Sequence, residues 1–181
     1  ILNYAHLQKY ILTLPPDNDE IEIPAEDFRN FIHSMIELFG DKGARALQLR
    51  AGREFVRIGT EKRPGMAKAL LVAARLLPET KRMHLALQKW IEGAEQRFPS
   101  HLSQPRFELQ EDEDFFIFTD RDNVSSSGMT AQKPVCGAFV GVLYALMELV
   151  TGHPHEVEEI ECRAMGHSAD VFRIMKRRRE V

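Results

Sequence analysis

The stretch from Cys136 to Ile174 decides the fold. It reads C-G-A-F-V-G-V-L at residues 136–143 and T-G-H-P-H-E-V-E-E-I-E-C-R-A-M-G-H-S-A-D-V-F-R-I at residues 151–174. Apolar residues dominate its first part, which predicts a buried helix. Polar and apolar residues alternate in its second part, which is typical of strands. The stretch therefore predicts a buried helix followed by an antiparallel pair of strands.

The expected bounds of these elements follow from the local sequence. The buried helix runs from Cys136 to Val150, and Gly152 is its C-terminal glycine. The two strands run from Val157 to Ala164 and from Val171 to Met175, joined by a turn at residues 165–168.

A second hairpin is expected upstream of the buried helix. Arg106 to Gln110 and Phe115 to Asp120 show the alternation and aromatic content of strands, with a polar turn between them. Residues 121–133 form a polar loop rich in Ser and Gly.

The N-terminal half has the spacing of amphipathic helices. A proline and two acidic residues open one of them at residues 24–27, and Gly40 closes it. The expected helices are Tyr4 to Leu14, Pro24 to Phe39, Gly43 to Glu61, Pro64 to Leu77, and Thr80 to Phe98.

This order of elements predicts an α+β fold, in which an antiparallel sheet packs against several helices. We expect one domain over residues 1–181, with a mainly helical part at 1–104 and the hairpin, helix and hairpin at 105–181. Many large apolar residues are available for its core or for a closed ligand pocket: Leu70, Leu71, Leu77, Leu85, Leu87, Trp90, Phe116, Phe118, Phe139, Leu143 and Leu146.

Charge and hydropathy argue against two classes of partner, nucleic acids and membranes. The formal net charge is -3 and the pI is about 6.2, which argues against nucleic-acid binding. The basic run at Lys176 to Arg179 is interpreted as a solvated tail. The most apolar stretch, Cys136 to Val150, is shorter than the roughly 20 residues of a membrane span, so no membrane partner is expected.

The two cysteines are too few for a disulfide framework, so we expect them to be reduced thiols or ligands and the protein to be cytoplasmic.

The stretch from 136 to 174 resembles the C-terminal signature of the 4-vinyl reductase (hydrocarbon-binding) domain family. That signature has a Cys before an apolar helix containing Gly, a Gly turn, the pattern V-x-E-x-x-C-x-A-x-G, and a final x-C-x-F-x-I strand. The matching residues are Cys136, Gly141, Gly152, Val157, Glu159, Cys162, Ala164, Gly166, Phe172 and Ile174.

The resemblance implies a fold and a function. The fold is similar to that of ligand-binding domains in nitric-oxide signalling and of transport-particle subunits. Some family members are effector-binding modules of regulators that sense aromatic hydrocarbons, and others are linked to bacteriochlorophyll biosynthesis. The implied ligand is a small hydrophobic or tetrapyrrole-like molecule, and the implied assembly is a homodimer.

The resemblance also implies a metal site. In the sensor branch of the family, a Cys, a Glu and two further Cys bind a structural zinc near the ligand pocket. Carried over residue by residue, these positions are Cys136, Glu159, Cys162 and Asp170. Asp170 departs from the expected Cys, but zinc accepts thiolate, imidazole and carboxylate ligands. His167, in the turn, is an alternative to one of the carboxylates.

Strand geometry sets a condition on this site. In a regular strand, Glu159 and Cys162 are three positions apart and point to opposite faces. Both reach one ion only at a strand end or a bulge. The sulfurs of Cys136 and Cys162 must also lie within about 8 Å of each other to share one zinc. The competing interpretation is that both cysteines are small core residues and Glu159 is solvated.

Other polar residues carry weaker signals. His153 and His155 flank a proline and are interpreted as a surface turn rather than a metal site. The arginines at 45, 50, 53 and 57 recur along one helix and either bind ligand carboxylates or form ordinary ion pairs. We find no catalytic residues, since phosphate loop, nucleophile elbow and HExxH motifs are missing from the sequence.

Three functions remain open at this point. The leading one is a small-molecule-binding sensor or carrier domain with a structural metal site. The second is an enzyme of 4-vinyl reductase type, or an accessory protein, in bacteriochlorophyll synthesis, although no nicotinamide or flavin motif is present to supply a hydride. The third is a structural or assembly subunit.

Overall fold

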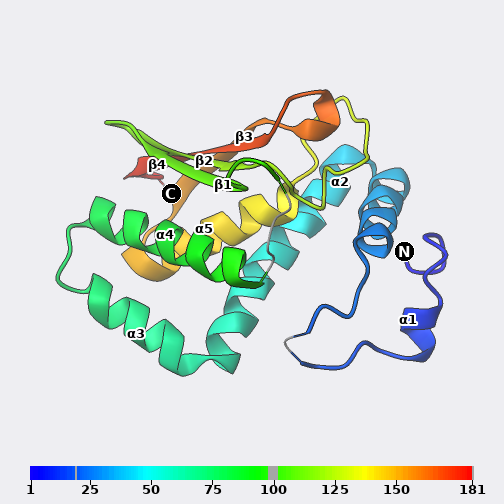
Figure 1. The fold of residues 1–181 in the computed structure, drawn as a ribbon, viewed down its shortest axis with the longest axis horizontal. Helices are drawn as coiled ribbons and strands as arrows, with labels where there is room; N and C mark the ends of the chain where they lie inside the picture. The colour runs from blue at the N-terminus through cyan, green and yellow to red at the C-terminus, as the bar shows by residue number, and fades with distance from the viewer. Residues whose placement is uncertain (19, 98–101, 181) are drawn as a thin grey trace.

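The structure is a computed structural model that describes residues 1–18, 20–97 and 102–180. It consists of an antiparallel four-stranded sheet with helices packed against one face (Figure 1). The elements in chain order are α1 (Lys9–Leu12), α2 (Ala25–Lys62), α3 (Pro64–Ala74), α4 (Glu79–Arg97), β1 (Phe107–Glu111), β2 (Phe115–Asp120), α5 (Gly137–Thr151), β3 (His155–Glu161), the 3-10 turn η1 (Arg163–Met165) and β4 (Asp170–Arg178). The predicted α+β class and the two predicted hairpins are confirmed.

The sheet has the strand order β1-β2-β4-β3. Both hairpins are antiparallel, and they meet where β2 pairs with β4. In that pairing, Asp120 at the end of β2 lies opposite Asp170 at the start of β4. The sheet therefore places two acidic residues side by side at one end of its central strands.

Strand β4 is longer than its sequence suggests. It continues through Lys176 to Arg178, so these residues belong to a strand rather than to the predicted tail, while Arg177 and Arg178 are exposed as predicted. The Lys176 ammonium lies 2.9 Å from a carboxylate oxygen of Glu111 and 4.9 Å from the ring centroid of Phe116. The run of basic residues predicted a solvated segment, but contacts with Glu111 and Phe116, which are distant in sequence, stabilise it as part of the strand.

Helix α2 joins two helices that the sequence predicts separately. Gly40 is non-helical with φ 66°, a left-handed conformation that glycine adopts without strain. The helix resumes directly after this kink instead of passing through a loop. Helix α1 is shorter than predicted, because only Lys9–Leu12 of the expected Tyr4 to Leu14 are helical. The predicted end of α4 at Phe98 and Pro99 lies outside the described residues.

Helices α2 and α5 are in backbone contact at two glycines. A Cβ on Gly52 would collide with the Ala138 carbonyl oxygen, and a Cβ on Gly141 would collide with the Leu49 carbonyl oxygen. Only glycine therefore fits at either position, and this contact fixes how α5 sits against α2.

The core lies between the sheet, α4 and α5, and its centre is aromatic. Trp90 of α4 contacts Phe107, Phe118 and Phe139, with ring centroids 4.9–5.6 Å apart. Phe139 of α5 lies 4.8 Å from Phe172 of β4. These five rings, Trp90, Phe107, Phe118, Phe139 and Phe172, are called the aromatic cluster below.

Candidate metal centre

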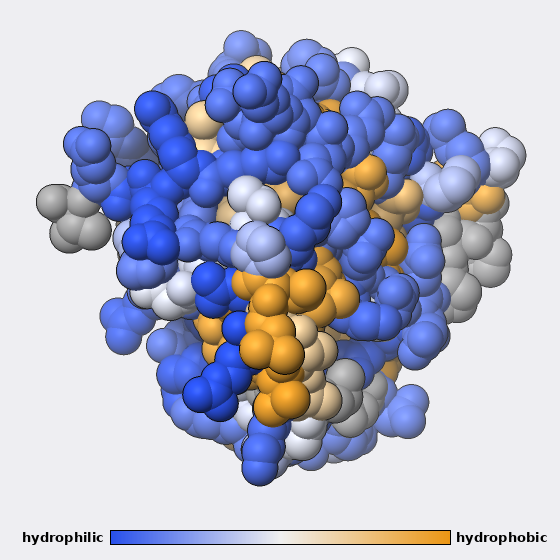
Figure 2. Space-filling view, turned by 90° about the vertical axis from the view of Figure 1, so that its left-hand side faces the viewer, coloured by the Kyte–Doolittle hydropathy of each residue, from blue (hydrophilic) through white to orange (hydrophobic). Residues whose placement is uncertain are grey.

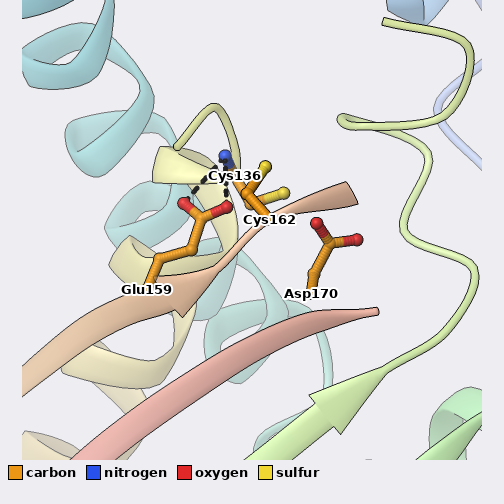
Figure 3. Close-up of side chains that lie close together, drawn as sticks. All are labelled: Cys136, Glu159, Cys162 and Asp170. Atoms are coloured by element: carbon orange, nitrogen blue, oxygen red, sulfur yellow. Dashed lines mark hydrogen bonds between the residues drawn. The ribbon is translucent and has the colours of Figure 1, made fainter. Parts of the chain in front are cut away.

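Four potential metal ligands meet at the N-terminal end of α5. Cys136 directly precedes that helix, Glu159 lies in β3, Cys162 follows β3, and Asp170 begins β4. All four are buried, and one ligand atom from each lies within 4.8 Å of the others. Figure 3 shows the two sulfurs near each other and between the two carboxylates. We call these residues the four-ligand group. They satisfy the distance condition for sharing one ion.

A bulge at the end of β3 brings Glu159 and Cys162 together. The pairing of β3 with β4 shifts register between Glu159 and Glu161, and the strand ends there. Cys162 is still extended, and the chain then turns through η1. The strand predicted to Ala164 is thus too long. The shift and the early end place two side chains, three positions apart, on the same side.

Hydrogen bonds fix both carboxylates in place. The backbone N–H of Cys136 donates to Glu159 Oε2 at 3.0 Å. Asp170 accepts from the Ser126 hydroxyl at 2.6 Å and from the Arg163 backbone N–H at 2.9 Å. Each carboxylate oxygen retains a further lone pair, so these bonds orient the ligands and leave capacity for a cation.

Ser126 is a supporting residue that sequence reasoning missed. It lies in the Ser- and Gly-rich loop and is 1% exposed. Nothing local in that loop marks Ser126 over its neighbours Ser125 and Ser127, because its partner Asp170 is 44 positions away.

The four-ligand group is acidic and has little cationic compensation. The nearest paired cation is the Arg45 guanidinium, 3.9 Å from Glu159 Oε2, and its side chain is 38% exposed. Burial raises the pKa of Glu159 to about 9. Hydrogen bonding from the Cys136 thiol is the main cause that lowers the pKa of Cys162 to about 6. The same bond, followed by burial, raises the pKa of Cys136 well above its usual value. Glu159 and Cys136 thus keep their protons at neutral pH, whereas Cys162 loses its proton more readily than an ordinary thiol, and a divalent cation would displace the retained protons.

The donor set fits zinc. Two thiols and two carboxylates are accepted zinc ligands, and structural sites have four protein ligands in a tetrahedron. Thiolates bound at about 2.3 Å lie about 3.8 Å apart in that geometry. The observed spacing, within 4.8 Å, therefore needs only a small contraction around an ion.

The other predicted ligand, His167, lies elsewhere. Its Nδ1 is 3.8 Å from a carboxylate oxygen of Glu161, and the side chain is 43% exposed. It is not part of the four-ligand group. Asp170, rather than His167, thus provides the fourth ligand atom of that group.

The opposite end of α5 carries a second polar cluster. Arg178 donates two hydrogen bonds through Nε and Nη2 to the Glu79 carboxylate. His155 is fully buried and its Nε2 lies 3.4 Å from Glu79, so the surface turn predicted for this histidine is wrong. Arg82 donates to the Val150 carbonyl in the last turn of α5. We call Glu79, Arg82, His155 and Arg178 the Glu79 cluster.

The arginines of α2 have separate environments. Arg57 pairs with Glu54 and Glu61 on the helix surface, and Arg53 lies over the ring of Tyr144 at 5.4 Å. Arg45 is the member of this series that forms an ion pair with the four-ligand group. They do not converge on one carboxylate-binding site.

A hollow of about 340 Å³ lies on the outer face of the sheet. Charged side chains dominate its lining, among them Glu156, Glu158, Arg173 and Arg177. A pocket for a hydrophobic molecule is expected to be mainly apolar. The apolar interior between α4, α5 and the sheet is filled by the aromatic cluster in this structure.

Comparison with known families confirms the predicted resemblance. Residues 116–176 match the model of the 4-vinyl reductase domain, and this segment contains the whole four-ligand group. A search of the curated proteins found no match.

Two kinds of solved structure share the fold. One is the phenol-responsive sensory domain of the transcription activator PoxR with phenol, with a TM-score of 0.58, 16% identity, and coverage of 86% of this chain and 76% of that one. Another is an H-NOX protein from S. oneidensis in the Fe(II)NO ligation state, with a TM-score of 0.56 and 8% identity. The match covers 97% of this chain and 89% of the H-NOX chain. The likeness predicted to ligand-binding domains of nitric-oxide signalling is confirmed at the level of the fold. Among the described residues, every helix is too short or too polar to traverse a bilayer.

Proposed function

We propose that this chain, whose residues 116–176 match the 4-vinyl reductase domain, is a sensor or carrier domain for a small hydrophobic ligand. A structural zinc ion is part of this proposal, with Cys136, Glu159, Cys162 and Asp170 as its ligands. The observation that carries the metal is the meeting of four buried donor atoms within 4.8 Å. The fold shared with a phenol-responsive sensory domain supports the ligand class.

The ion would hold three separate parts of the chain together. Bound zinc supplies a tetrahedral cross-link without redox chemistry of its own. Cys136 anchors the start of α5, Glu159 and Cys162 anchor the end of β3, and Asp170 anchors the start of β4. The backbone N–H of Cys136 and the Ser126 hydroxyl orient the two carboxylates.

The aromatic cluster is the proposed ligand region. Phe139 and Phe172 are close in sequence to Cys136 and Asp170, so ligand contacts reach the four-ligand group through α5 and β4. Because the rings fill this space, a ligand must displace Trp90 and with it α4. Helix α4 contacts the rest of the fold through this aromatic packing, through the buried Met83 and Leu87, and through the Glu79 cluster, and we propose that it is the element that moves when a ligand binds.

Metal content tests the first half of the proposal. Purified protein should contain about one zinc per chain by elemental analysis, the stoichiometry of one four-ligand site. Cys162→Ser should lower this value to near zero, whereas His167→Ala serves as the control and should leave it unchanged. Zinc retained in Cys162→Ser would remove that residue from the ligand set.

Ligand binding is tested with the single tryptophan. Trp90 is the only Trp in the chain and lies in the aromatic cluster, so its fluorescence reports occupancy there. Titration with phenol and with protoporphyrin IX should give saturable quenching for one of them. Fluorescence unchanged by both would contradict the proposed region.

A turnover assay separates a carrier from an enzyme. The protein is incubated with a divinyl tetrapyrrole and a reductant, and the product is analysed for an ethyl group. Tight spectral binding without product is expected for a carrier. Formation of the ethyl product would replace the carrier proposal with a reductase.

A further inference from the structure

Helix α3 is apolar yet lies on the surface. Its sequence, P-G-M-A-K-A-L-L-V-A-A, is typical of a core helix, and such a sequence predicts Leu71 and Leu77 in or near the core. Instead, Leu71 is 38% exposed, Val72 is 62% exposed, and Leu76 in the following turn is 92% exposed. Figure 2 shows apolar side chains gathered into a patch on the side of the molecule where α3 and the α3–α4 turn lie. We call Leu71, Val72, Leu76 and Leu77 the α3 patch.

Positive charge accompanies the α3 patch. Lys68 and Arg75 are both exposed, and they lie three or four positions from Leu71 and Val72, so all four share a helix face. The stretch from Lys62 to Leu77 contains four basic residues and no Asp or Glu; Lys62 pairs with Asp17, and the charge beside the α3 patch comes from Lys68 and Arg75. This local excess contrasts with the net charge of -3 of the whole chain. A partner of this surface must therefore be both apolar and anionic.

Charge also argues against a second copy of the chain as the partner. A two-fold dimer through this surface would place the same positively charged helix face on both sides of the interface. Like charges across an interface are unfavourable. An anionic lipid surface provides both apolar depth and negative charge for such a helix.

We propose that α3 lies on the surface of an anionic lipid bilayer, with the α3 patch in the acyl region and with Lys68 and Arg75 at the headgroups. The helix has 11 residues, too few to span a bilayer, so it would lie in the plane of the interface. This differs from our sequence-based expectation that no membrane is a partner. The proposal is independent of the metal and ligand sites, because it uses none of their residues.

Vesicle sedimentation tests the proposal with the full chain. The protein should co-sediment with equimolar phosphatidylglycerol and phosphatidylcholine vesicles, and much less with pure phosphatidylcholine. High salt should release it, because exposed charges are screened. Val72→Asp combined with Leu76→Asp should weaken vesicle binding at least about tenfold, because the two aspartates would place negative charges against an anionic and apolar membrane surface.

A matched control separates this face from general hydrophobicity. Leu12 and Leu14 are 85% and 78% exposed, near α1 on the other side of the molecule in Figure 1. Leu12→Asp combined with Leu14→Asp should leave vesicle binding unchanged. Lys68→Glu with Arg75→Glu keeps the apolar side chains and should reduce binding by about tenfold or more; it also carries the test if the Asp variant fails to fold by circular dichroism.

Three results would overturn the proposal. The first is no sedimentation with anionic vesicles. The second is binding that neither pair of α3 substitutions weakens, or that is equally strong on neutral vesicles. The third is a dimer in analytical ultracentrifugation that Val72→Asp with Leu76→Asp converts to monomer, because the α3 patch would then be a self-association surface.

Discussion

A cluster of polar residues lies at each end of helix α5, fully buried at the N-terminal end and partly exposed at the C-terminal end, and the charges of the two clusters are arranged in opposite ways. At its C-terminal end, the Glu79 carboxylate accepts two hydrogen bonds from Arg178 and has Arg82 and His155 nearby. At its N-terminal end, two carboxylates and two thiols meet, and Arg45 lies 3.9 Å away at the edge.

This difference separates a structural cluster from a candidate binding site. In the Glu79 cluster, cations pair with a partly buried acid, which compensates its charge. In the four-ligand group, burial instead raises the pKa of Glu159 to about 9, and the hydrogen bond with Cys162 together with burial raises the pKa of Cys136, so these two groups keep their protons at neutral pH. The four-ligand group, with Arg45 at its edge as its paired cation, is therefore the end of α5 at which we expect an external cation.

The largest effect is expected at Gly141, where the backbone of α5 contacts the backbone of α2. Gly141→Ala should lower the free energy of unfolding by about 2–3 kcal/mol, because its Cβ would collide with the Leu49 carbonyl oxygen and force α5 away from α2. Urea unfolding followed by circular dichroism measures this change. Gly93→Ala in α4 is the control, since nothing lies within 4 Å of its Cβ, and it should stabilise by about 0.5–1 kcal/mol.

The next largest effect concerns the four-ligand group at the N-terminal end of helix α5. Asp170→Asn retains an oxygen that accepts hydrogen bonds but removes the negative charge, so zinc affinity should fall about a hundredfold. Competition with a chelator of known affinity measures this loss. Asp122→Asn, at an exposed carboxylate 3.7 Å from Arg163, is the control and should bind zinc normally. Equal affinities for the two variants would show that Asp170 is only a hydrogen-bond acceptor.

A smaller, pH-dependent effect is expected in the Glu79 cluster at the C-terminal end of helix α5. Hydrogen bonds from Arg178 hold the pKa of Glu79 below its usual value. A carboxylate with a lowered pKa stabilises the fold above its unfolded pKa, and this contribution is lost as the pH falls through the folded pKa. Glu79→Gln should therefore lower the free energy of unfolding by about 0.5–1 kcal/mol at pH 7, and the deficit should shrink below about pH 4.

Urea titrations at several pH values measure this difference. Glu92→Gln, which removes an exposed ion pair with Lys89 within the same helix, is the control. Its effect should be at most about 0.5 kcal/mol. A deficit in Glu79→Gln that persists unchanged at low pH would mean that packing, and not the ion pair, is lost.

The smallest effect is expected at His167. The sequence indicates it as a ligand candidate, but its imidazole is near Glu161 and outside the four-ligand group. His167→Ala should retain the zinc content and zinc affinity of the parent protein in the same assays. A clear loss of zinc would place the turn at residues 166–168 closer to the ion than the structure does.

Local sequence patterns predicted most of the fold. The bounds of β2 match the expectation, and α5 differs from it by one residue at each end. Both elements have strong patterns that depend on near neighbours. The bulge after Glu159 could not be located in this way, because register depends on the facing strand β4. The family resemblance indicated the four ligands, whereas strand periodicity alone argued against them.

Long-range contacts account for the remaining errors. His155 follows a proline and looks like a turn residue, but it is buried because Glu79, 76 positions earlier, lies against it. The basic residues Lys176 and Arg178 belong to a strand because Glu111 and Glu79 pair with them. Helix α3 differs in the opposite direction: its apolar sequence predicts burial, but the fold buries Ala74 and leaves Leu71 and Val72 exposed.

The glycine contact between α2 and α5 has a mechanical consequence. With backbone against backbone at Gly52 and Gly141, no side chain is left to change rotamer and absorb a displacement. A shift of α5 that accompanies a rearrangement at Cys136 must therefore carry the second half of α2 with it. That segment extends about 15 Å from Gly52 to Lys62 and leads directly into α3. The contact thus couples the position of α5 to that of the part of α2 that follows the kink at Gly40.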